Sequence, residues 1–388
     1  MKIKKLSVIA LLLALVMLVG CGNQTPTVVK VEAPAATAPT ETAAPAVSEA
    51  PAASEAPATE APAPVQKPKG EVPSASTSVF SMDTIMTITC WGDRCEEAIE
   101  AATAEIYRLN ALLSVGDEKS EISMVNAAGN GILSPESQLM VKKALQIYET
   151  TGGAFDITVY PLMELWGFTS GNMAVPNEEK LQKVLADVGA DKLNFDDENG
   201  EIILGPRQGI DLGGIAKGFT SDRLMDIFAD YDLVAGIVSL GGNIECYGTK
   251  VDGSLWKCGI RSPFEPENPY SLYGILSTTA TSIITSGAYE RNFTENGVLY
   301  HHIIDPKTGK PSNSGLASVT IVSRSGVLAD GLSTACYVLG LEGATKYWQE
   351  YGEEFGFDLI LIADDGTVYV TEPISENFTS DYPTVVIR

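Results

Sequence analysis

The stretch IDLGGIAKGF, residues 210–219, joins an apolar approach to a helix-forming segment through the pair Gly213–Gly214. Glycines at the start of a helix allow close approach of another backbone or a ligand, and exposed amide groups with the helix dipole favour a phosphate there. Lys217 could add a positive charge. The spacing matches neither GxGxxG nor GxxxxGKS/T, so it predicts neither a dinucleotide fingerprint nor a P-loop. Taken alone, a Gly-Gly pair more often marks a simple turn.

The segments around this helix predict hairpins with interspersed helices, an α+β arrangement rather than repeated βαβ units. Aromatic residues begin at Phe80, which leaves about 310 residues for the folded region, enough for a large core and two lobes. We therefore expect a two-lobed α+β domain over residues 77–388, with largely antiparallel sheets and flanking helices. Apolar spacing, caps and turns predict a strand at 80–91, helices at 94–113, 135–152, 177–189, 211–229, 327–339 and 341–351, a hairpin around Asn199–Gly200, short strands within 233–323, and strands at 358–371 and 383–388.

Residues 1–21 predict a lipoprotein signal peptide. Three lysines precede an apolar run at 6–19, which has the length of a signal-peptide core and is short for a membrane span. The run ends in Leu-Val-Gly-Cys, which resembles the bacterial lipobox. We expect export, cleavage before Cys21, and lipid on Cys21 that anchors the protein at the outer face of the bacterial cytoplasmic membrane. The alternative is an ordinary secretory signal with a chance cysteine.

Residues 22–76 predict a disordered tether. They are mostly Ala, Pro, Thr, Ser and Glu, without aromatic residues or apolar periodicity. Such a segment buries too little surface to offset its ordering entropy, and its prolines favour an extended spacer.

The net charge of the folded region excludes one class of partner. Residues 1–76 carry six Lys and six Glu, so the rest of the chain holds 20 basic and 44 acidic residues, a net charge of −24. This charge argues against binding nucleic acid through a general basic face. A bound divalent cation would fit, although acidic surfaces are usually only solvating.

The cysteine pattern predicts no structural zinc. The chain has no CxxC and no Cys/His cluster at zinc spacing. The number of cysteines beyond Cys21 is odd, so at least one is unpaired unless it bridges chains, and no disulfide framework is evident: Cys90, Cys95, Cys246, Cys258 and Cys336.

A second informative stretch is LADGLSTACYVLG, residues 328–340. On a helix, Asp330 and Thr334 are four residues apart and share one face. A carboxylate and a hydroxyl are hard oxygen donors suited to Mg²⁺, with water and substrate phosphates completing its coordination. The alternative is an Asp that interacts with the helix dipole and a Thr that bonds back to the backbone.

A third stretch, GGAFDITVYPLMELWGF at residues 152–168, carries Phe155, Asp156, Tyr160 and Trp166 after a glycine pair that ends a helix. Such a loop can stack on an aromatic ring, although its aromatics fit a hydrophobic core equally well.

The two histidines of the chain are adjacent, in YHHIIDPKTG at residues 300–309. Neighbours in a strand point to opposite faces, so His301 and His302 should not share one role. The following Asp305–Pro306 predicts a turn that brings the end of the strand to the mouth of a cleft.

Together these stretches resemble the ApbE family of FAD:protein FMN transferases, which are often exported lipoproteins. The resemblance rests on eight motifs in order across residues 77–388: MDT at 82–84, SEISMVN at 120–126, GGAFDITVYPL, IDLGGIAKG, SLGGNI at 239–244, TSGAYERNF at 285–293, HHIIDPKTG and ADGLSTA. One departure is Gly116, at a position where the family often has an aromatic residue, which removes an expected stacking contact.

The resemblance implies FAD in a cleft of an α+β fold, with its pyrophosphate on Mg²⁺. It assigns the metal ligands to the main-chain carbonyl of Ala216 and the side chains of Asp330 and Thr334. It assigns the functional imidazole to His302, and leaves His301 as a partly exposed strand residue. It places the FAD contacts at Met82, Ala154, Phe155, Asp156, Gly213, Lys217 and the backbone near Ile304.

The implied activity is Mg²⁺-dependent transfer of FMN from FAD to a Thr or Ser hydroxyl of an exported acceptor protein, with release of AMP. The acceptor would carry a Ser/Thr-Gly-Ala-Thr segment. Two alternatives stay open from sequence: an Mg²⁺-dependent FAD pyrophosphatase that uses water, and a non-catalytic ligand-binding lipoprotein. Asp330 and Thr334, together with the glycine turn at 213–214, count against a ligand-binding lipoprotein, because a solute receptor needs neither a metal site nor a phosphate site.

Overall fold

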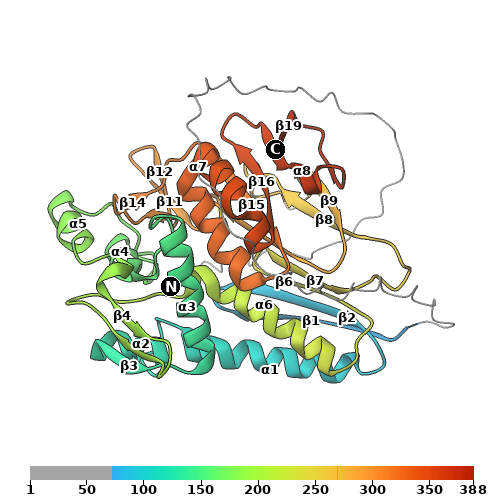
Figure 1. The fold of residues 1–388 in the computed structure, drawn as a ribbon, viewed down its shortest axis with the longest axis horizontal. Coiled ribbons are helices and arrows are strands. Elements are labelled where there is room, and N and C mark those ends of the chain that lie inside the picture. The colour runs from blue at the N-terminus through green and yellow to red at the C-terminus, as the bar shows by residue number, and fades with distance from the viewer. Residues whose placement is uncertain (1–71, 269) are drawn as a thin grey trace, which may run out of the picture.

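A computed structural model describes residues 72–268 and 270–388 and is built around one nine-stranded sheet (Figure 1). The pairings in this sheet are antiparallel except for the last, which is parallel. This confirms the expected α+β class with largely antiparallel sheets. In spatial order the strands are β1 (Ser74–Ser81), β2 (Thr84–Trp91), β6 (Ala235–Leu240), β7 (Asn243–Gly248), β10 (Ser282–Gly287), β15 (Leu316–Ser323), β16 (Phe357–Ala363), β17 (Val368–Thr371) and β19 (Thr384–Ile387).

The long helices lie on one face of this sheet (Figure 1). They are α1 (Cys95–Leu113), α3 (Pro135–Thr150), α6 (Gly213–Asp230) and α7 (Gly326–Phe355). The opposite face of its C-terminal half packs on a three-stranded sheet of β8 (Trp256–Arg261), β9 (Leu272–Thr278) and β18 (Phe378–Thr379). Strand β16 contributes to a core on each face of the large sheet. Leu359 and Leu361 belong to the core beneath the helices. The alternate residues Ile360 and Ile362 belong to the core between the two sheets.

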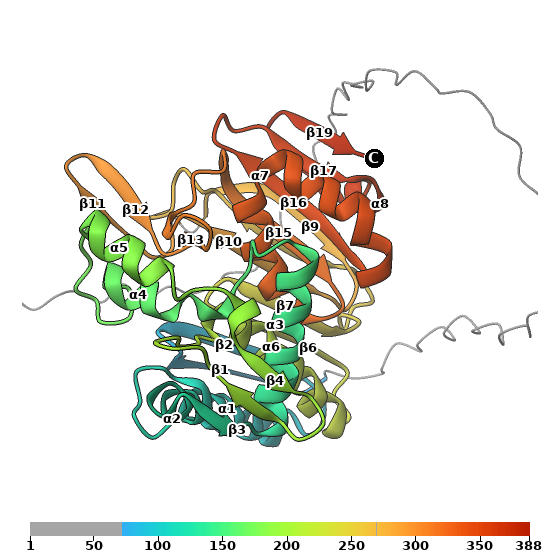
Figure 2. The same cartoon turned by 60° about the vertical axis from the view of Figure 1, so that its left-hand side comes forward.

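A smaller lobe projects from one side of the sheet, where α4, α5 and the hairpin β11–β12 lie together (Figure 2). It has its own core, which includes Leu162, Trp166, Leu181 and Ile304. Its elements are α4 (Tyr160–Trp166), α5 (Glu178–Leu185), β11 (Asn292–Glu295), β12 (Val298–His301), β13 (Ile304–Asp305) and β14 (Lys310–Pro311). The remaining elements are α2 (Glu121–Ala128), a small sheet of β3 (Asn130–Ile132), β5 (Glu201–Ile203) and β4 (Asn194–Asp196), α8 (Glu372–Ser375), and two 3₁₀ turns at Ile157–Val159 and Ala190–Lys192.

Most helices begin where their caps predict. Ser134 caps α3 and Asn177 caps α5, each accepting hydrogen bonds from amides of the first turn. The helices expected at 327–339 and 341–351 form one element, α7, interrupted at Gly340, which has a non-helical backbone. The helix expected to reach Gly189 ends at Leu185.

The continuous strand expected at 80–91 is wrong. β1 ends at Ser81 and β2 begins at Thr84, with Met82 and Asp83 in left-handed conformations (φ 47° and 59°). Two such residues make the tight turn that suits a twisted hairpin. The alternation of Thr and Ile gave no sign of it, because neither turn residue is Gly or Asn.

The folded region begins earlier than the expected boundary at residue 77. β1 starts at Ser74, and the Ser76 hydroxyl donates to the Ile88 carbonyl at 3.1 Å. The signal peptide, Cys21 and the tether as far as residue 71 lie outside the described residues. Within residues 72–268 and 270–388, no helix has the length and apolar character needed to cross a membrane.

The crossing of α6 and α7 has the closest backbone approach near the centre of the molecule. A Cβ added at Gly218 would collide with the Gly326 carbonyl, and one added at Gly326 would lie 2.5 Å from the Gly218 carbonyl oxygen. Asp222 of α6 accepts hydrogen bonds from the amides of Gly326 and Val327, at 2.6 and 2.9 Å, and so caps the N-terminus of α7. The two helices therefore meet through their backbones and the Asp222 carboxylate, which places the first turn of α7 beside the second and third turns of α6.

Candidate active site

The first turn of α6 forms one wall of the site. The Gly213 amide donates to Asp211 Oδ1 at 2.8 Å, and Gly213 itself is exposed. The buried ring of Phe155 packs beside Gly214, where an added Cβ would lie 3.0 Å from it, and also beside Gly331 of α7. Phe155 thus joins the loop after α3 to both helices, while Asp211 accepts from the first amide of α6.

The three expected metal ligands lie on α6 and α7, and a hydrogen bond joins the two helices next to two of them. Asp330 is 4% exposed, and its Oδ2 accepts a hydrogen bond from the Gly218 amide at 2.7 Å. The Ala216 carbonyl, two residues before Gly218, accepts from the Thr220 hydroxyl at 2.8 Å, so a second partner reaches this oxygen besides the helical amide. Thr334 lies one turn beyond Asp330 and is half-buried, with its hydroxyl 3.4 Å from that of Ser286.

This donor set fits Mg²⁺. It offers one carboxylate and one hydroxyl, which are hard oxygen donors, and one carbonyl, whose oxygen the Thr220 hydroxyl would release to the cation. Asp330 Oδ1 has no hydrogen-bond partner among the described residues, so the carboxylate keeps one oxygen for a cation. The described part of the chain holds no cluster of three His, Cys, Asp or Glu side chains placed to bind a metal ion.

The hairpin turn between β1 and β2 lies against the same region. The Met82 amide donates to Asn110 Oδ1 at 3.1 Å, and Met82 Sδ lies 3.9 Å from the Thr220 hydroxyl. Asp83 forms an ion pair with Arg291 at 3.2 Å. The turn that sequence patterning missed therefore places Met82 next to the residue that contacts the Ala216 carbonyl.

The loop at residues 152–156 is held from inside the protein. Ala154 and Phe155 are buried. Asp156 accepts hydrogen bonds from the amide and hydroxyl of Thr158 at 2.8 and 2.7 Å, and from the Ala190 amide at 3.2 Å. Burial raises the pKa of Asp156, and these bonds oppose the shift. Its carboxylate orders the loop, and a direct contact of Asp156 with FAD stays a prediction.

His302 is positioned by the backbone of Arg291. The His302 amide donates to the Arg291 carbonyl at 3.0 Å, and the ring Nδ1 lies 3.2 Å from the same oxygen. Because a carbonyl only accepts, Nδ1 must carry the proton, and Nε2 keeps its lone pair. Burial, then the charges of Arg291 and Lys217, lower the pKa of His302 to about 3. The imidazole is therefore neutral near pH 7.

His301 differs from its expected state. It ends β12 and is 6% exposed rather than partly exposed. Its Nε2 donates to the Ser312 carbonyl at 2.9 Å, and its Nδ1 accepts from the Ile303 amide at 3.3 Å. The turn after Asp305 folds β14 back and brings Ser312 to this ring, so both nitrogens of His301 are used internally. The expected difference in role between the two histidines fits this geometry.

Ile304 lies in the core of the smaller lobe, where its side chain is buried. It pairs with Pro311 of β14. The main-chain carbonyl of the next residue, Asp305, accepts hydrogen bonds from the amides of Thr308 and Gly309. This confirms the expected Asp305–Pro306 turn. The side chain of Ile304 thus anchors the segment that follows His302.

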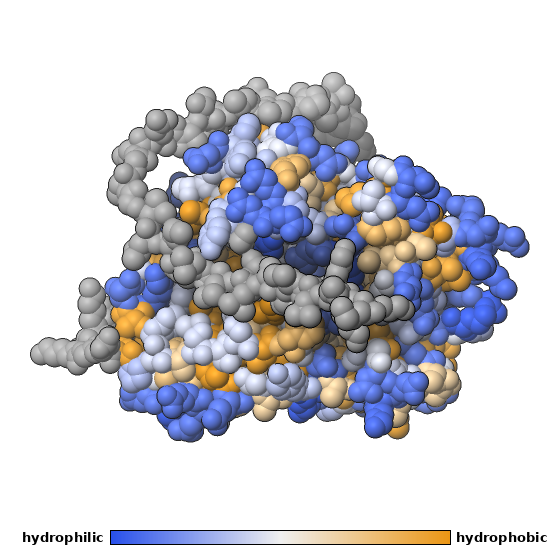
Figure 3. Space-filling view, turned by 180° about the vertical axis from the view of Figure 1, so that it is seen from behind, coloured by the Kyte–Doolittle hydropathy of each residue, from blue (hydrophilic) through white to orange (hydrophobic). Residues whose placement is uncertain are grey.

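Charged residues of the motif TSGAYERNF complete the surroundings, and sequence reasoning gave them no role. Glu290 keeps a solvent-accessible surface, yet desolvation by the surrounding protein raises its pKa, opposed by Lys217 and Arg261. A Cβ added at Gly242, in the motif SLGGNI, would lie 3.1 Å from Glu290 Oε1. From behind, Figure 3 shows a hydrophilic hollow near the middle of the molecule.

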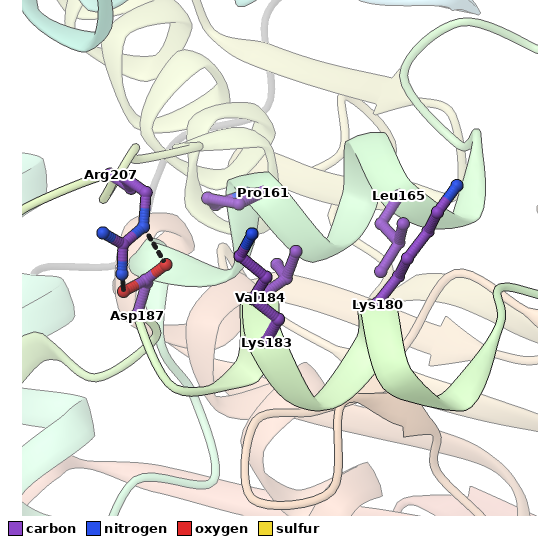
Figure 4. A pocket seen from close by; sticks show the side chains of 7 residues that line it. All are labelled: Pro161, Leu165, Lys180, Lys183, Val184, Asp187 and Arg207. Atoms are coloured by element: carbon purple, nitrogen blue, oxygen red, sulfur yellow. Dashed lines mark hydrogen bonds and ion pairs between the residues drawn. The ribbon is translucent and has the colours of Figure 1, made fainter.

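A separate groove lies between α4 and α5 (Figure 4). Its floor includes Pro161, Leu165 and Val184, and an ion pair of Arg207 with Asp187 at 2.6 Å closes one end. None of the expected site residues lines this groove.

Comparison with known proteins identifies the family. A model of the ApbE family matches residues 82–356, more than half of the chain. The chain belongs to the ApbE family. The matched range contains every expected site residue except Cys21.

Relatives of this ApbE-family chain carry a named activity. The FAD:protein FMN transferase of Treponema pallidum is 30% identical over 323 residues, which cover 77% of this chain and 87% of that protein. The FAD:protein FMN transferase of Haemophilus influenzae is 31% identical over 291 residues, covering 73% and 82%.

Solved structures of ApbE proteins share the fold. The ApbE protein of Thermotoga maritima superposes with a TM-score of 0.73 at 30% identity, covering 79% of this chain and 99% of that one. The flavin transferase ApbE from Vibrio cholerae gives a TM-score of 0.66 at 27% identity, covering 81% and 98%.

We predict that the two histidines of this ApbE chain hold opposite tautomers. The carbonyl partners require Nδ1–H on His302 and Nε2–H on His301, and burial lowers both pKa values, so both rings should be neutral above pH 7. Long-range ¹H–¹⁵N spectra of the imidazoles distinguish the tautomers, and His302→Gln assigns the signals. A His302 ring that carries its proton on Nε2, or that titrates near its ordinary pKa of about 6.5, would contradict this geometry.

Proposed function

We propose that the chain transfers FMN from FAD to a Thr or Ser hydroxyl of an acceptor protein and releases AMP. The observation that carries the proposal is the 2.7 Å hydrogen bond from the Gly218 amide of α6 to Asp330 of α7, which holds a buried carboxylate two residues from Ala216 and one turn from Thr334. The names of the relatives, at about 30% identity over most of their length, support the reaction class.

The proposed magnesium ion would be held by Asp330, Thr334 and the Ala216 carbonyl. When bound, it would neutralise negative charge on the FAD pyrophosphate and on the phosphoryl group being transferred. Lys217 would bind the same phosphates, since an ammonium favours anions and the dipole of α6 adds to its charge. Each of these groups comes from the α6–α7 crossing, so one packing contact orders them.

His302 is the proposed general base. Its free Nε2 would accept the proton of the acceptor hydroxyl as that oxygen attacks the FMN phosphorus and the bond to the AMP phosphate breaks. A pKa of about 3 would make a weak base; burial is the largest cause, followed by the charges of Arg291 and Lys217. A bound pyrophosphate would offset the two cations and raise the pKa of His302 in part, while the effect of burial would remain.

The proposed setting is the outer face of a membrane. The basic start, apolar run and Leu-Val-Gly-Cys of residues 1–21 support lipid attachment at Cys21, followed by a spacer rich in Pro and Ala. Membrane fractionation checks this proposal, because Cys21→Ser should move the protein into the soluble fraction. Retention of that variant on the membrane would contradict it.

The transfer reaction is tested with the full chain, FAD, Mg²⁺ and an acceptor that contains a Ser/Thr-Gly-Ala-Thr segment. Mass spectrometry should find FMN added to the acceptor. His302→Ala should lower the transfer rate by ~10²–10⁴-fold, the usual contribution of a general base, while FAD still binds. The matched control is His301→Ala, which should lower the melting temperature but keep the rate per folded molecule within a few-fold.

Other outcomes separate the alternatives. Free FMN and AMP without a labelled acceptor would indicate a pyrophosphatase. Intact FAD would indicate a binding protein. Equal losses of rate in the two histidine variants would contradict the assignment of the base to His302.

A further inference from the structure

Two buried cysteines face each other between the two sheets. Cys246 of β7 and Cys258 of β8 have their sulfur atoms 3.8 Å apart, and both residues belong to the core between the nine-stranded and three-stranded sheets. They are 2% and 3% exposed. Their strands belong to different sheets, so no backbone ladder joins them.

The local packing holds β7 and β8 against each other. On β8, Trp256, Cys258 and Ile260 point into the core at alternate positions. The Trp256 indole N–H donates to the Gly248 carbonyl at the end of β7, at 3.1 Å, and its ring lies 6.1 Å from that of Trp91. This contact fixes β8 against β7 only two residues from each cysteine. The sulfur atoms are therefore held near each other by the surrounding packing.

We propose that Cys246 and Cys258 form a disulfide that braces the three-stranded sheet against the nine-stranded sheet. The separation must close from 3.8 Å to the ~2.05 Å of a covalent S–S bond, which needs rotation of two side chains or a small shift of one strand. The bond would close a loop of about a dozen residues and reduce the entropy of the unfolded chain.

The other cysteines do not offer the same arrangement. Cys336 is fully buried on α7 in the helix-side core, and Cys90 directs its thiol toward the Cys95 carbonyl at 3.5 Å. All five cysteines of the described region are present as thiols. The pair between the sheets is the one whose cross-link would tie two separate sheets together.

The reaction is a thiol–disulfide exchange with an oxidised partner, either a protein disulfide or a small-molecule disulfide. The thiolate of one cysteine attacks the partner's S–S bond and forms a mixed disulfide. The second cysteine then attacks the first sulfur, and the partner leaves as two thiols. The pair loses two electrons and two protons, and the partner gains them.

The order of events follows from burial. The contact with Cys258, and then burial, raise the pKa of the Cys246 thiol. Because exchange requires the thiolate, the folded and reduced protein should react slowly. The bond should form while the chain folds, before the two sheets close over the sulfur atoms.

The test uses the full chain, unfolded and then refolded in a buffer of oxidised and reduced glutathione, with remaining thiols alkylated before digestion. Trypsin cleaves after Arg223, Lys250, Lys257 and Arg261, so the bond should link peptide 224–250 to peptide 258–261. Recovery of both peptides in alkylated form, or linkage of either to another cysteine, would overturn the proposal. This outcome does not depend on FAD chemistry.

Melting temperatures test the bracing role. The oxidised protein should melt roughly 5 °C or more above the reduced protein, the scale expected for a cross-link of this loop length. The difference should vanish in Cys258→Ala and persist in the matched control Cys336→Ala, which removes another buried thiol. Equal melting temperatures for the oxidised and reduced wild-type protein would overturn the bracing role. The peptide analysis uses the wild-type chain, so it shows whether the disulfide forms even if a variant does not fold.

Discussion

The contact between Gly218 and Gly326 is the constraint on which the site depends. A side chain at either position would collide with the backbone of the other helix, so α6 and α7 approach as closely as two backbones can. The approach lets Asp330 reach the Gly218 amide and lets Asp222 cap α7. Two helices far apart in the sequence thereby place the Asp330 carboxylate against the backbone of α6, 112 residues from its partner Gly218.

The same crossing concentrates positive charge within an acidic protein. The chain has 26 Lys and Arg against 50 Asp and Glu, yet Lys217 and Arg291 act together on His302, and Lys217 and Arg261 act on Glu290. A net negative surface would repel a dinucleotide, so a local cationic region beside the start of α6 gives an anionic group a place to bind. Burial, together with these cations, keeps His302 neutral, so the charge of a bound substrate would affect part of the shift in its pKa.

Sequence reasoning reached the parts of the site that follow local periodicity. Asp330 and Thr334 share a helix face because they are four residues apart, and Gly213–Gly214 marked the start of a helix. The sequence did not predict features that depend on contacts between residues far apart along the chain. The Met82–Asp83 turn lacks the usual turn residues, and the burial of His301 depends on Ser312, which a later turn brings back. The roles of Glu290 and Arg291 depend on charges from α6, which no local pattern of TSGAYERNF reveals.

The most direct test of the account is binding of Mn²⁺, as a spectroscopic substitute for Mg²⁺, to Asp330→Asn. The asparagine carbonyl can still accept from the Gly218 amide, so the helix crossing should survive, whereas the negative ligand is lost. We predict that the variant melts within a few degrees of the wild type and that its Mn²⁺ affinity in the presence of FAD, measured by electron paramagnetic resonance, falls at least ~10-fold, since hydrogen bonds and contacts to a charged group exceed those to a neutral one by about 1–2 kcal/mol. Unchanged Mn²⁺ affinity in a folded Asp330→Asn protein would place the metal elsewhere and contradict the account.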